Sequence, residues 1–303
     1  MRKIDETKTR FYFAADTDVL INLSKLAAGN SEELKKEAYI VDKYKTLWEM
    51  VYNGDVKLYV TPQVLSELGN KITQYTSYMA SRNDVAVFID MAKFVRAFCY
   101  PIYIEHENII AFQEKAKHLA ERYCVEAGVD GIISEGVDGT QYVIPSKDAK
   151  VLAEASVCGL TLLTSNTIDM IINSKNKRAT IQKVDIIEKI NMEEGLGYGD
   201  RCLWNKAPAP MSVIDFLKHL PNCYMDQPFL PDTNFAVKDL DPLEVDKEYR
   251  ESYNRYYKFM FFIENTTKDT VEAIGIEKPY EYIINGVRYK EDTLNNDDGK
   301  QDE

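Results

Sequence analysis

Short apolar runs alternate along the first 220 residues with longer stretches in which apolar side chains recur every three or four positions. The short runs are typical of buried strands, and the periodic stretches are typical of amphipathic helices. Strands are predicted at 11–15, 57–60, 100–104 and 160–164, and helices at 16–26, 31–53, from 61 onward, 146–155, 181–190 and 213–220. This alternation predicts an α/β fold with a mainly parallel sheet that helices cover on both faces.

Local signals place several element ends. Thr61 followed by Pro62 is typical of a helix start, because threonine caps the first turn and proline needs no amide partner there. Ser146 is expected to begin a helix that Gly159 ends. The stretch 128–139, which is rich in glycine and acidic residues, is predicted to be a loop.

The sequence changes character after Pro221, so we predict a main domain over 1–220, with 71–144 as a largely helical insertion. Residues 221–290 form a predicted appendage, in which tyrosines cluster at 249–257 and Asn285-Gly286 indicates a β-hairpin over 282–289. The last segment, 291–303, is polar and acidic, and we expect it to be disordered.

The 303 residues are 45% hydrophobic and 28% charged, which is ordinary for a globular protein. No stretch reaches the roughly 18 uncharged apolar residues that span a bilayer, and the N-terminus lacks an apolar run of signal-peptide length. We therefore expect a cytoplasmic protein without a membrane partner. The five cysteines are scattered and include no CxxC pair, which argues against a disulfide framework or a zinc knuckle.

A net charge of −12 argues against strong non-specific binding to nucleic acid. Residues 221–303 carry about −9 of this charge and residues 1–220 only about −3. A function on nucleic acid would therefore need a local site with a bound metal ion. A basic segment contains Lys175, Lys177 and Arg178, with Lys183 and Lys189 further on. It is either a solvated helix face or a patch that binds phosphates.

Four acidic residues occupy comparable places between predicted strands and helices. Asp16 directly follows the first strand and Asp169 follows the strand at 160–164, while Glu67 and Asp148 lie early in helices. Each one alone has an ordinary explanation, such as an N-cap for Asp16. Together they are placed at the rim of a parallel sheet, where open α/β folds bind ligands. Carboxylates converging there would repel one another unless a divalent cation lay between them.

Other chemistries have weaker support in the sequence. The three histidines lie near no serine or cysteine nucleophile signature, and no GxGxxG or P-loop run is present. The glycine-rich stretch 195–199 lacks the P-loop lysine and does not follow a strand, so it is interpreted as a flexible loop.

The acidic motifs resemble those of PIN-domain nucleases. Residues 13–21 (FAADTDVLI) resemble the opening of that family, 61–68 (TPQVLSEL) its glutamate helix, 148–155 (DAKVLAEA) its third acidic helix, 162–170 (LLTSNTIDM) its closing motif, and 209–217 (APMSVIDFL) its last helix. The resemblance covers roughly residues 10–220. Many members carry aspartate where this chain has Asn166, so either Asn166 or Asp169 corresponds to the fourth ligand position. The segment between Glu67 and Asp148 is longer than in small members, and residues 221–303 match no known pattern.

The resemblance implies a three-layer PIN-like fold and an Mg²⁺- or Mn²⁺-dependent endoribonuclease, of the toxin or phage-defence type. Asp16, Glu67 and Asp148 would form the metal shell, and Asp169 would complete it or orient the attacking water. Thr164, Ser165 and Asn166 would supply hydrogen bonds and, with Lys175, Lys177 and Arg178, contact the substrate.

Several partners and alternatives stay open at this point. The expected partners are RNA or single-stranded DNA, an antitoxin or other protein, and further copies of the chain. The alternative functions are a non-catalytic PIN-fold module that binds RNA or serves as a scaffold, a DNA nuclease, and a phosphatase that uses the same acids.

Overall fold

The computed structural model describes the core of the first 220 residues and a short hairpin near the C-terminus. The described residues are 11–29, 38–75, 90–91, 93–95, 97–102, 109–136, 139–166, 170–171, 182–199, 205–220, 281–284 and 287–290. The predicted appendage therefore lies outside the described residues except for its hairpin, and so does the predicted tail at 291–303.

A five-stranded sheet forms the centre of the protein, with the strand order β3-β2-β1-β6-β7. Every neighbouring pair in it is parallel. The strands are β1 (Phe11–Ala15), β2 (Val56–Val60), β3 (Cys99–Pro101), β6 (Thr161–Thr164) and β7 (Pro210–Ser212). Since β1 lies in the middle, the chain builds β2 and β3 on one side of it and β6 and β7 on the other.

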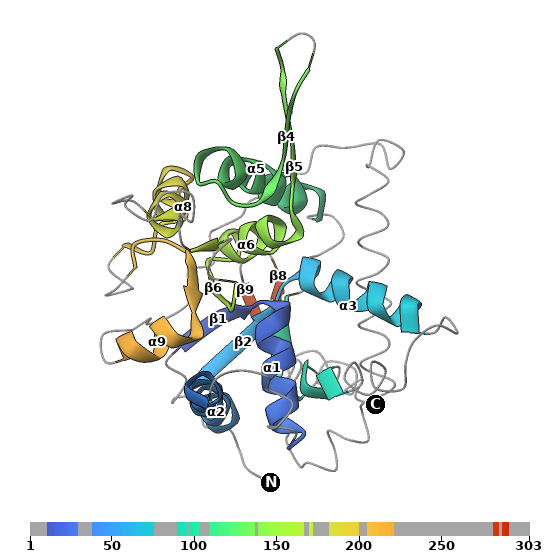
Figure 1. Cartoon of the computed structure of the whole chain (residues 1–303), viewed down its shortest axis with the longest axis vertical. Helices are drawn as coiled ribbons and strands as arrows, with labels where there is room; N and C mark the ends of the chain where they lie inside the picture. Colours follow the sequence, from blue (N-terminus) through green and yellow to red (C-terminus); the bar gives the residue numbers. More distant parts are fainter. Residues whose placement is uncertain are drawn as a thin grey trace, which may run out of the picture.

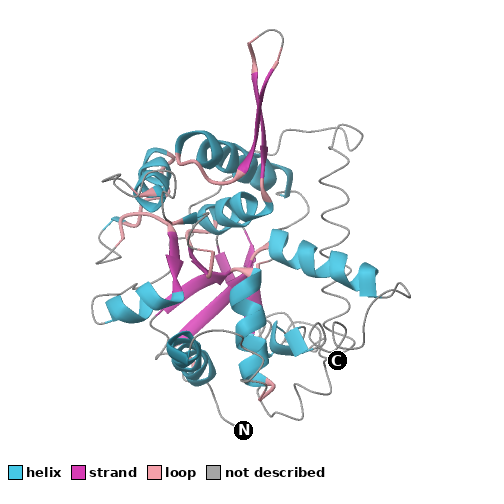
Figure 2. Ribbon diagram, in the orientation of Figure 1, coloured by secondary structure: helices cyan, strands magenta, loops and turns pink. Residues whose placement is uncertain are grey.

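Every residue of β1, β2 and β6 is buried, as expected for a parallel sheet that is covered on both faces. Figures 1 and 2 show the helices in two groups around the sheet. One group is α1 (Thr17–Ala27), α2 (Ala38–Asn53) and α9 (Val213–His219), and the other is α3 (Pro62–Tyr75), α5 (Ile109–Glu126), α6 (Lys147–Val157) and α8 (Lys183–Glu193). The α/β class with a parallel sheet is confirmed.

The helix ends follow the sequence signals. The Ser146 hydroxyl accepts a hydrogen bond from the Ala149 amide at 3.1 Å and so caps α6. At the other end, Gly159 has a φ of +68°, which a residue with a side chain rarely adopts. There the Gly159 amide donates to the Ser156 carbonyl at 2.9 Å and the Leu160 amide to the Ala155 carbonyl at 2.9 Å. This cap directs the chain from α6 into β6.

Two short elements were not expected. β7 escaped prediction because it has only three residues and begins with a proline. The loop predicted at 128–139 was wrong, since β4 (Gly131–Glu135) pairs in antiparallel fashion with β5 (Gln141–Pro145). Isoleucines in both strands favour this hairpin over a loop. The hairpin expected near the C-terminus is confirmed as β8 (Glu281–Ile284) and β9 (Val287–Lys290).

The β4–β5 hairpin projects from the body as an arm (Figures 1 and 2). Ile132, Tyr142 and Ile144 are more than half exposed along it, whereas Val143 packs against the core. Within the described ranges, every helix is too short or too polar to cross a lipid bilayer.

Residues 210–220 belong to the core through Phe216 of α9. Its fully buried ring lies edge-on to Phe13, at 4.8 Å between centroids, and to Phe11, at 5.3 Å. Both partners are in β1, so this contact fixes the last helix of the domain against the central strand.

The Phe216→Ala variant should lower the free energy of unfolding by about 3–5 kcal/mol, because it leaves a cavity against β1. Urea denaturation measures this loss. The matched control is Lys218→Ala on the same helix, where the lysine is 57% exposed and pairs with Asp215; its effect should stay within about 0.5 kcal/mol. Equal effects for the two variants would contradict the packing role of Phe216.

Candidate active site

The candidate site lies where the chain changes direction in the sheet. β1 and β6 are neighbours, but the connections that leave them build opposite halves of the sheet. The carboxyl ends of such strands border a crevice in which open α/β folds bind ligands. The amide of Asp16 donates to the Leu163 carbonyl at 3.0 Å, so the pairing of β1 with β6 continues to the first candidate residue.

Asp16 caps α1 and is buried, with 7% of its surface exposed. Its Oδ1 accepts a hydrogen bond from the Thr17 amide at 2.7 Å, and its Oδ2 accepts one from the Thr164 hydroxyl at 2.8 Å. The first donor belongs to the helix after β1, and the second belongs to the end of β6. The carboxylate is therefore held from the ends of both β1 and β6.

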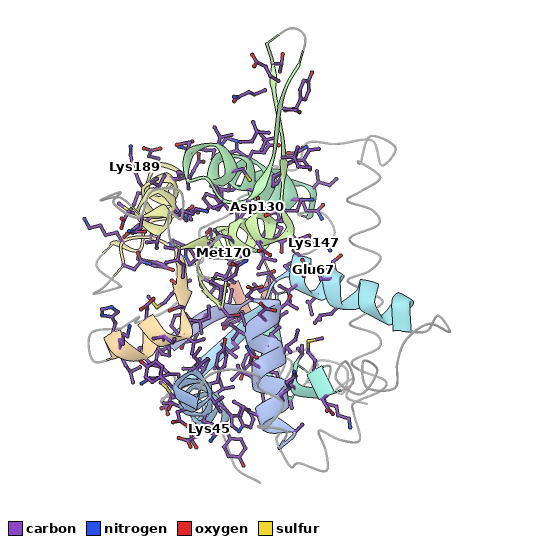
Figure 3. All side chains as sticks on the ribbon, in the orientation of Figure 1. Lys45, Glu67, Asp130, Lys147, Met170 and Lys189 are labelled. Atoms are coloured by element: carbon purple, nitrogen blue, oxygen red, sulfur yellow. The ribbon has the colours of Figure 1, made fainter. Side chains whose placement is uncertain are left out.

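Glu67 joins Asp16 through Thr17. The Thr17 hydroxyl donates to Oε2 of Glu67 at 3.2 Å, and the Gln63 side-chain amide donates to Oε1 at 3.2 Å. Gln63 and Glu67 are one helical turn apart on α3, which begins directly after β2. Figure 3 shows Glu67 near the start of α3, on the side that faces Lys147 at the start of α6.

Asp148 joins Asp16 through Asn166 and Thr164. The Asn166 side-chain amide donates to Oδ2 of Asp148 at 2.8 Å, while its backbone amide donates to the Thr164 hydroxyl oxygen at 2.9 Å. That same hydroxyl donates to Asp16. Three of the four predicted acids are thus linked by hydrogen bonds through Thr17, Thr164 and Asn166.

Three further side chains, those of Asp18, Ser165 and Tyr44, border this group. The Ser165 hydroxyl donates to Oδ2 of Asp18 at 3.4 Å. Burial raises the pKa of the Tyr44 phenol, and the charges of Asp18 and Asp16 raise it further. Tyr44, which belongs to α2, therefore lies beside the acidic group.

The electrostatics of Asp16 reflect this crowding. Burial raises the pKa of Asp16 to about 6 from an ordinary 3.8. The hydrogen bonds from Thr164 and Thr17 lower the pKa, whereas the neighbouring charges of Asp148 and Asp18 raise it. The ionised carboxylate is therefore less stable here than in water, and a nearby cation would relieve the repulsion.

The donor set is chemically suited to Mg²⁺ or Mn²⁺, because every candidate ligand atom is an oxygen. Among the residues that the structure describes, no three His, Cys, Asp or Glu side chains gather closely enough to hold a metal ion by themselves. Mg²⁺ does not need such a cage, since it keeps several waters and is usually bound through one or two carboxylates and substrate phosphates.

Some of the remaining predicted site residues lie outside the described residues. Asp169, Lys175, Lys177 and Arg178 lie outside the described residues, so their roles stay predictions. Further along the basic segment, Lys189 pairs with Glu193 on α8 at 3.7 Å, and Figure 3 shows it away from Glu67. Lys183 is buried at the start of α8. Lys189 therefore lies apart from the linked acidic group.

Thr17, Gln63 and Glu154 contribute to these contacts, although no role was predicted for them from the sequence. Thr17 and Gln63 are polar residues in first helical turns, and nothing in the sequence separates them from ordinary capping residues. Glu154 did leave a signal, because it is the one charge in the run Val151–Leu163. An isolated charge in such a run indicates a buried ionisable group.

Replacing Asp16 with asparagine should stabilise the protein at neutral pH. The folded state holds the proton of Asp16 more tightly than the unfolded chain, so the free energy of unfolding falls as pH rises from about 4 through about 6. Asparagine keeps the cap of α1 but carries no charge. We expect Asp16→Asn to gain about 1–3 kcal/mol at pH 7.5 and almost nothing at pH 4.

Urea denaturation in the presence of a chelator, at both pH values, tests this expectation. The control is Asp42→Asn on α2, where the carboxylate is 74% exposed beside Lys45; it should show no gain at either pH. A loss of stability at pH 7.5 for Asp16→Asn would contradict the repulsion described at this position.

Comparison with known proteins finds no relative of this chain. No family model matches it, and neither a curated protein nor a solved structure matches it. The PIN-domain assignment therefore rests on the resemblance of the motifs alone.

Proposed function

We propose that this protein is a metal-dependent phosphodiesterase with a three-layer PIN-like fold, and that it cleaves RNA as an endonuclease. One observation carries the proposal: Asp16, Glu67 and Asp148 come from three separate elements and are linked by hydrogen bonds at the edge between β1 and β6. These residues are 132 positions apart at most along the chain, from 16 to 148, so only a folded site unites them.

The charge of this group favours a cation over a purely structural role. A helix cap does not need three further carboxylates nearby. Burial of Asp16, and to a lesser extent the charges of Asp148 and Asp18, works against stability. Arrangements that cost stability are common where a ligand compensates the cost. Oxygen ligands select hard divalent ions, so Mg²⁺ and Mn²⁺ are the proposed cofactors.

In the proposed mechanism Asp16, Glu67 and Asp148 would hold the cation. A bound divalent ion supplies a water of lowered pKa and stabilises charge on the phosphate. Thr17, Thr164 and Asn166 orient the carboxylates, because each donates a hydrogen bond to one of them. Asp169 is proposed to complete the ligand set or to orient the attacking water.

The choice of RNA and the role as a toxin or defence effector come from the family resemblance. Lys175, Lys177 and Arg178 follow the closing motif in sequence, which is why they are proposed to bind substrate phosphates. Single-stranded DNA is the nearest alternative substrate, since the same acids serve either backbone. An antitoxin or another protein partner belongs to the same proposal.

A second candidate function is a non-catalytic RNA-binding or scaffold module with the same fold. The amide of Asn166 donates directly to Asp148, so that carboxylate has a hydrogen-bond donor without any metal ion. Binding of Mn²⁺, measured by calorimetry, separates the two candidates. A scaffold module would bind Mn²⁺ weakly, and Asp148→Ala would change nothing.

The test of the leading proposal is cleavage of defined single-stranded RNA and DNA in Mg²⁺ or Mn²⁺. Asp16→Asn and Asp148→Asn should each lower the cleavage rate at least about 100-fold. Loss of a group that only hydrogen-bonds to a metal ligand lowers activity up to about 100-fold, and loss of the ligand itself should cost at least as much. Asp42→Asn, an exposed acid on α2, should cleave like the unchanged protein.

Because Asp16→Asn is expected to be more stable than the unchanged protein, its loss of activity would not be explained by unfolding. Metal-independent cleavage, or equal cleavage by Asp16→Asn and the unchanged protein, would overturn the proposal. Preferential cleavage of DNA would change the proposed substrate from RNA to DNA, and the proposed reaction class would stay the same.

A further inference from the structure

Glu154 of α6 is a buried acid that the proposed mechanism does not use. It lies six residues after Asp148 on the same helix, and only 7% of its surface is exposed. Its Oε2 accepts a hydrogen bond from the backbone amide of Gln63 at 2.7 Å. Gln63 is the second residue of α3, so Glu154 reaches from one helix to the first turn of another.

The first turn of α3 is a favourable place for this carboxyl group. Amides of a first turn have no partner within their own helix, and the helix dipole favours negative charge there. Burial nevertheless raises the pKa of Glu154 to about 8, against an ordinary 4.5. The hydrogen bonds from Gln63 and Thr61 lower the pKa, the charge of Glu67 raises it, and that of Lys150 lowers it.

Two side chains accept hydrogen bonds from the first turn of α3. Thr61 already precedes the helix, and its hydroxyl accepts from the Val64 amide at 3.4 Å as a local cap. Glu154 accepts from a different amide of the first turn, that of Gln63, and does so at the cost of burying an ionisable side chain. What Glu154 adds is a bond between α3 and α6.

Gln63 connects Glu154 to the candidate site. Its backbone amide donates to Glu154, while its side-chain amide donates to Oε1 of Glu67. One residue therefore connects the buried acid of α6 to the candidate ligand of α3. The same helix α6 also carries Asp148. Both candidate ligands, Glu67 and Asp148, are therefore connected to α6.

We propose that Glu154 is a positioning residue: through Gln63 it fixes α3 against α6 and so sets where the Glu67 carboxylate lies relative to Asp148. The effect on metal affinity rests on the proposed function, in which Glu67 and Asp148 are ligands. The effect on the placement of Glu67 does not depend on it.

The test compares three variants with the unchanged protein. Glu154→Met removes both acceptor atoms at similar size, Glu154→Gln keeps one carboxamide oxygen for the Gln63 amide, and Gln63→Ala keeps the backbone contact but removes the link to Glu67. Glu114→Met on α5, where the glutamate is exposed, is the control for an added methionine. Circular dichroism confirms that each variant is folded.

Calorimetric titration with Mn²⁺ alone is the first measurement. Glu154→Met and Gln63→Ala should each weaken Mn²⁺ binding about 10- to 100-fold, as loss of outer hydrogen-bonding partners does at metal sites. Glu154→Gln should stay within about threefold of the unchanged protein, because it restores the acceptor. Combining Glu154→Met with Gln63→Ala should add little, since both interrupt the same chain of contacts.

The second measurement needs no metal. The side-chain carboxyl ¹³C resonance of Glu67, assigned by its loss in Glu67→Gln, should move in Glu154→Met and Gln63→Ala but not in Glu154→Gln or Glu114→Met. A Glu67 resonance that stays in place in Gln63→Ala would overturn the positioning role, and it does so even when Glu154→Met fails to fold.

The two measurements separate the two proposals. Absence of Mn²⁺ binding by the unchanged protein would count against the proposed function, while the Glu67 resonance would still decide the positioning role. Normal Mn²⁺ binding by both Glu154→Met and Gln63→Ala would contradict any influence of Glu154 on the metal site.

Discussion

The buried carboxylate of Asp16 is the constraint on which the site depends. It lies between two parallel strands whose following segments diverge, and donors from both sides hold it, the Thr17 amide and the Thr164 hydroxyl. Burial and the charges of Asp148 and Asp18 destabilise its ionised form. The surrounding donors offset only part of this cost. The proposed cation would compensate this imbalance at the edge between β1 and β6.

Helix α6 organises the site around this constraint. Its first turn carries Asp148, its buried middle carries Glu154, and its glycine cap turns the chain into β6, which ends at Thr164. One helix thus presents a candidate ligand, bonds to the helix that presents another, and leads into the strand that holds Asp16. The hydrogen bond from Gln63 to Glu154 ties α3 to α6, and these two helices carry Glu67 and Asp148. Rigid elements of this kind place side chains more accurately than loops do.

Stability and function are in opposition at two positions. Asp16 and Glu154 are both carboxyl groups whose pKa burial raises, to about 6 and about 8. Each therefore favours folding less at neutral pH than at acidic pH. The aromatic packing of Phe216 on β1 and the full burial of β1, β2 and β6 supply the stability that tolerates these groups. Polar groups that reduce stability in an otherwise apolar core are typical of functional sites.

The sequence by itself determined the α/β class, most strands and helices, and the candidate acids. Periodicity and capping residues are local signals, so Ser146 and Gly159 mark element ends that the structure confirms. It could not determine β7 or the β4–β5 arm, because three-residue strands and hairpins depend on partners distant in sequence. Nor could it show which acids meet: that Thr17 contacts Glu67, or that Gln63 serves both Glu67 and Glu154, requires strand order and helix packing. Only the tertiary structure decides these contacts, because they join α1, α3, α6 and the end of β6 across up to 148 positions of sequence.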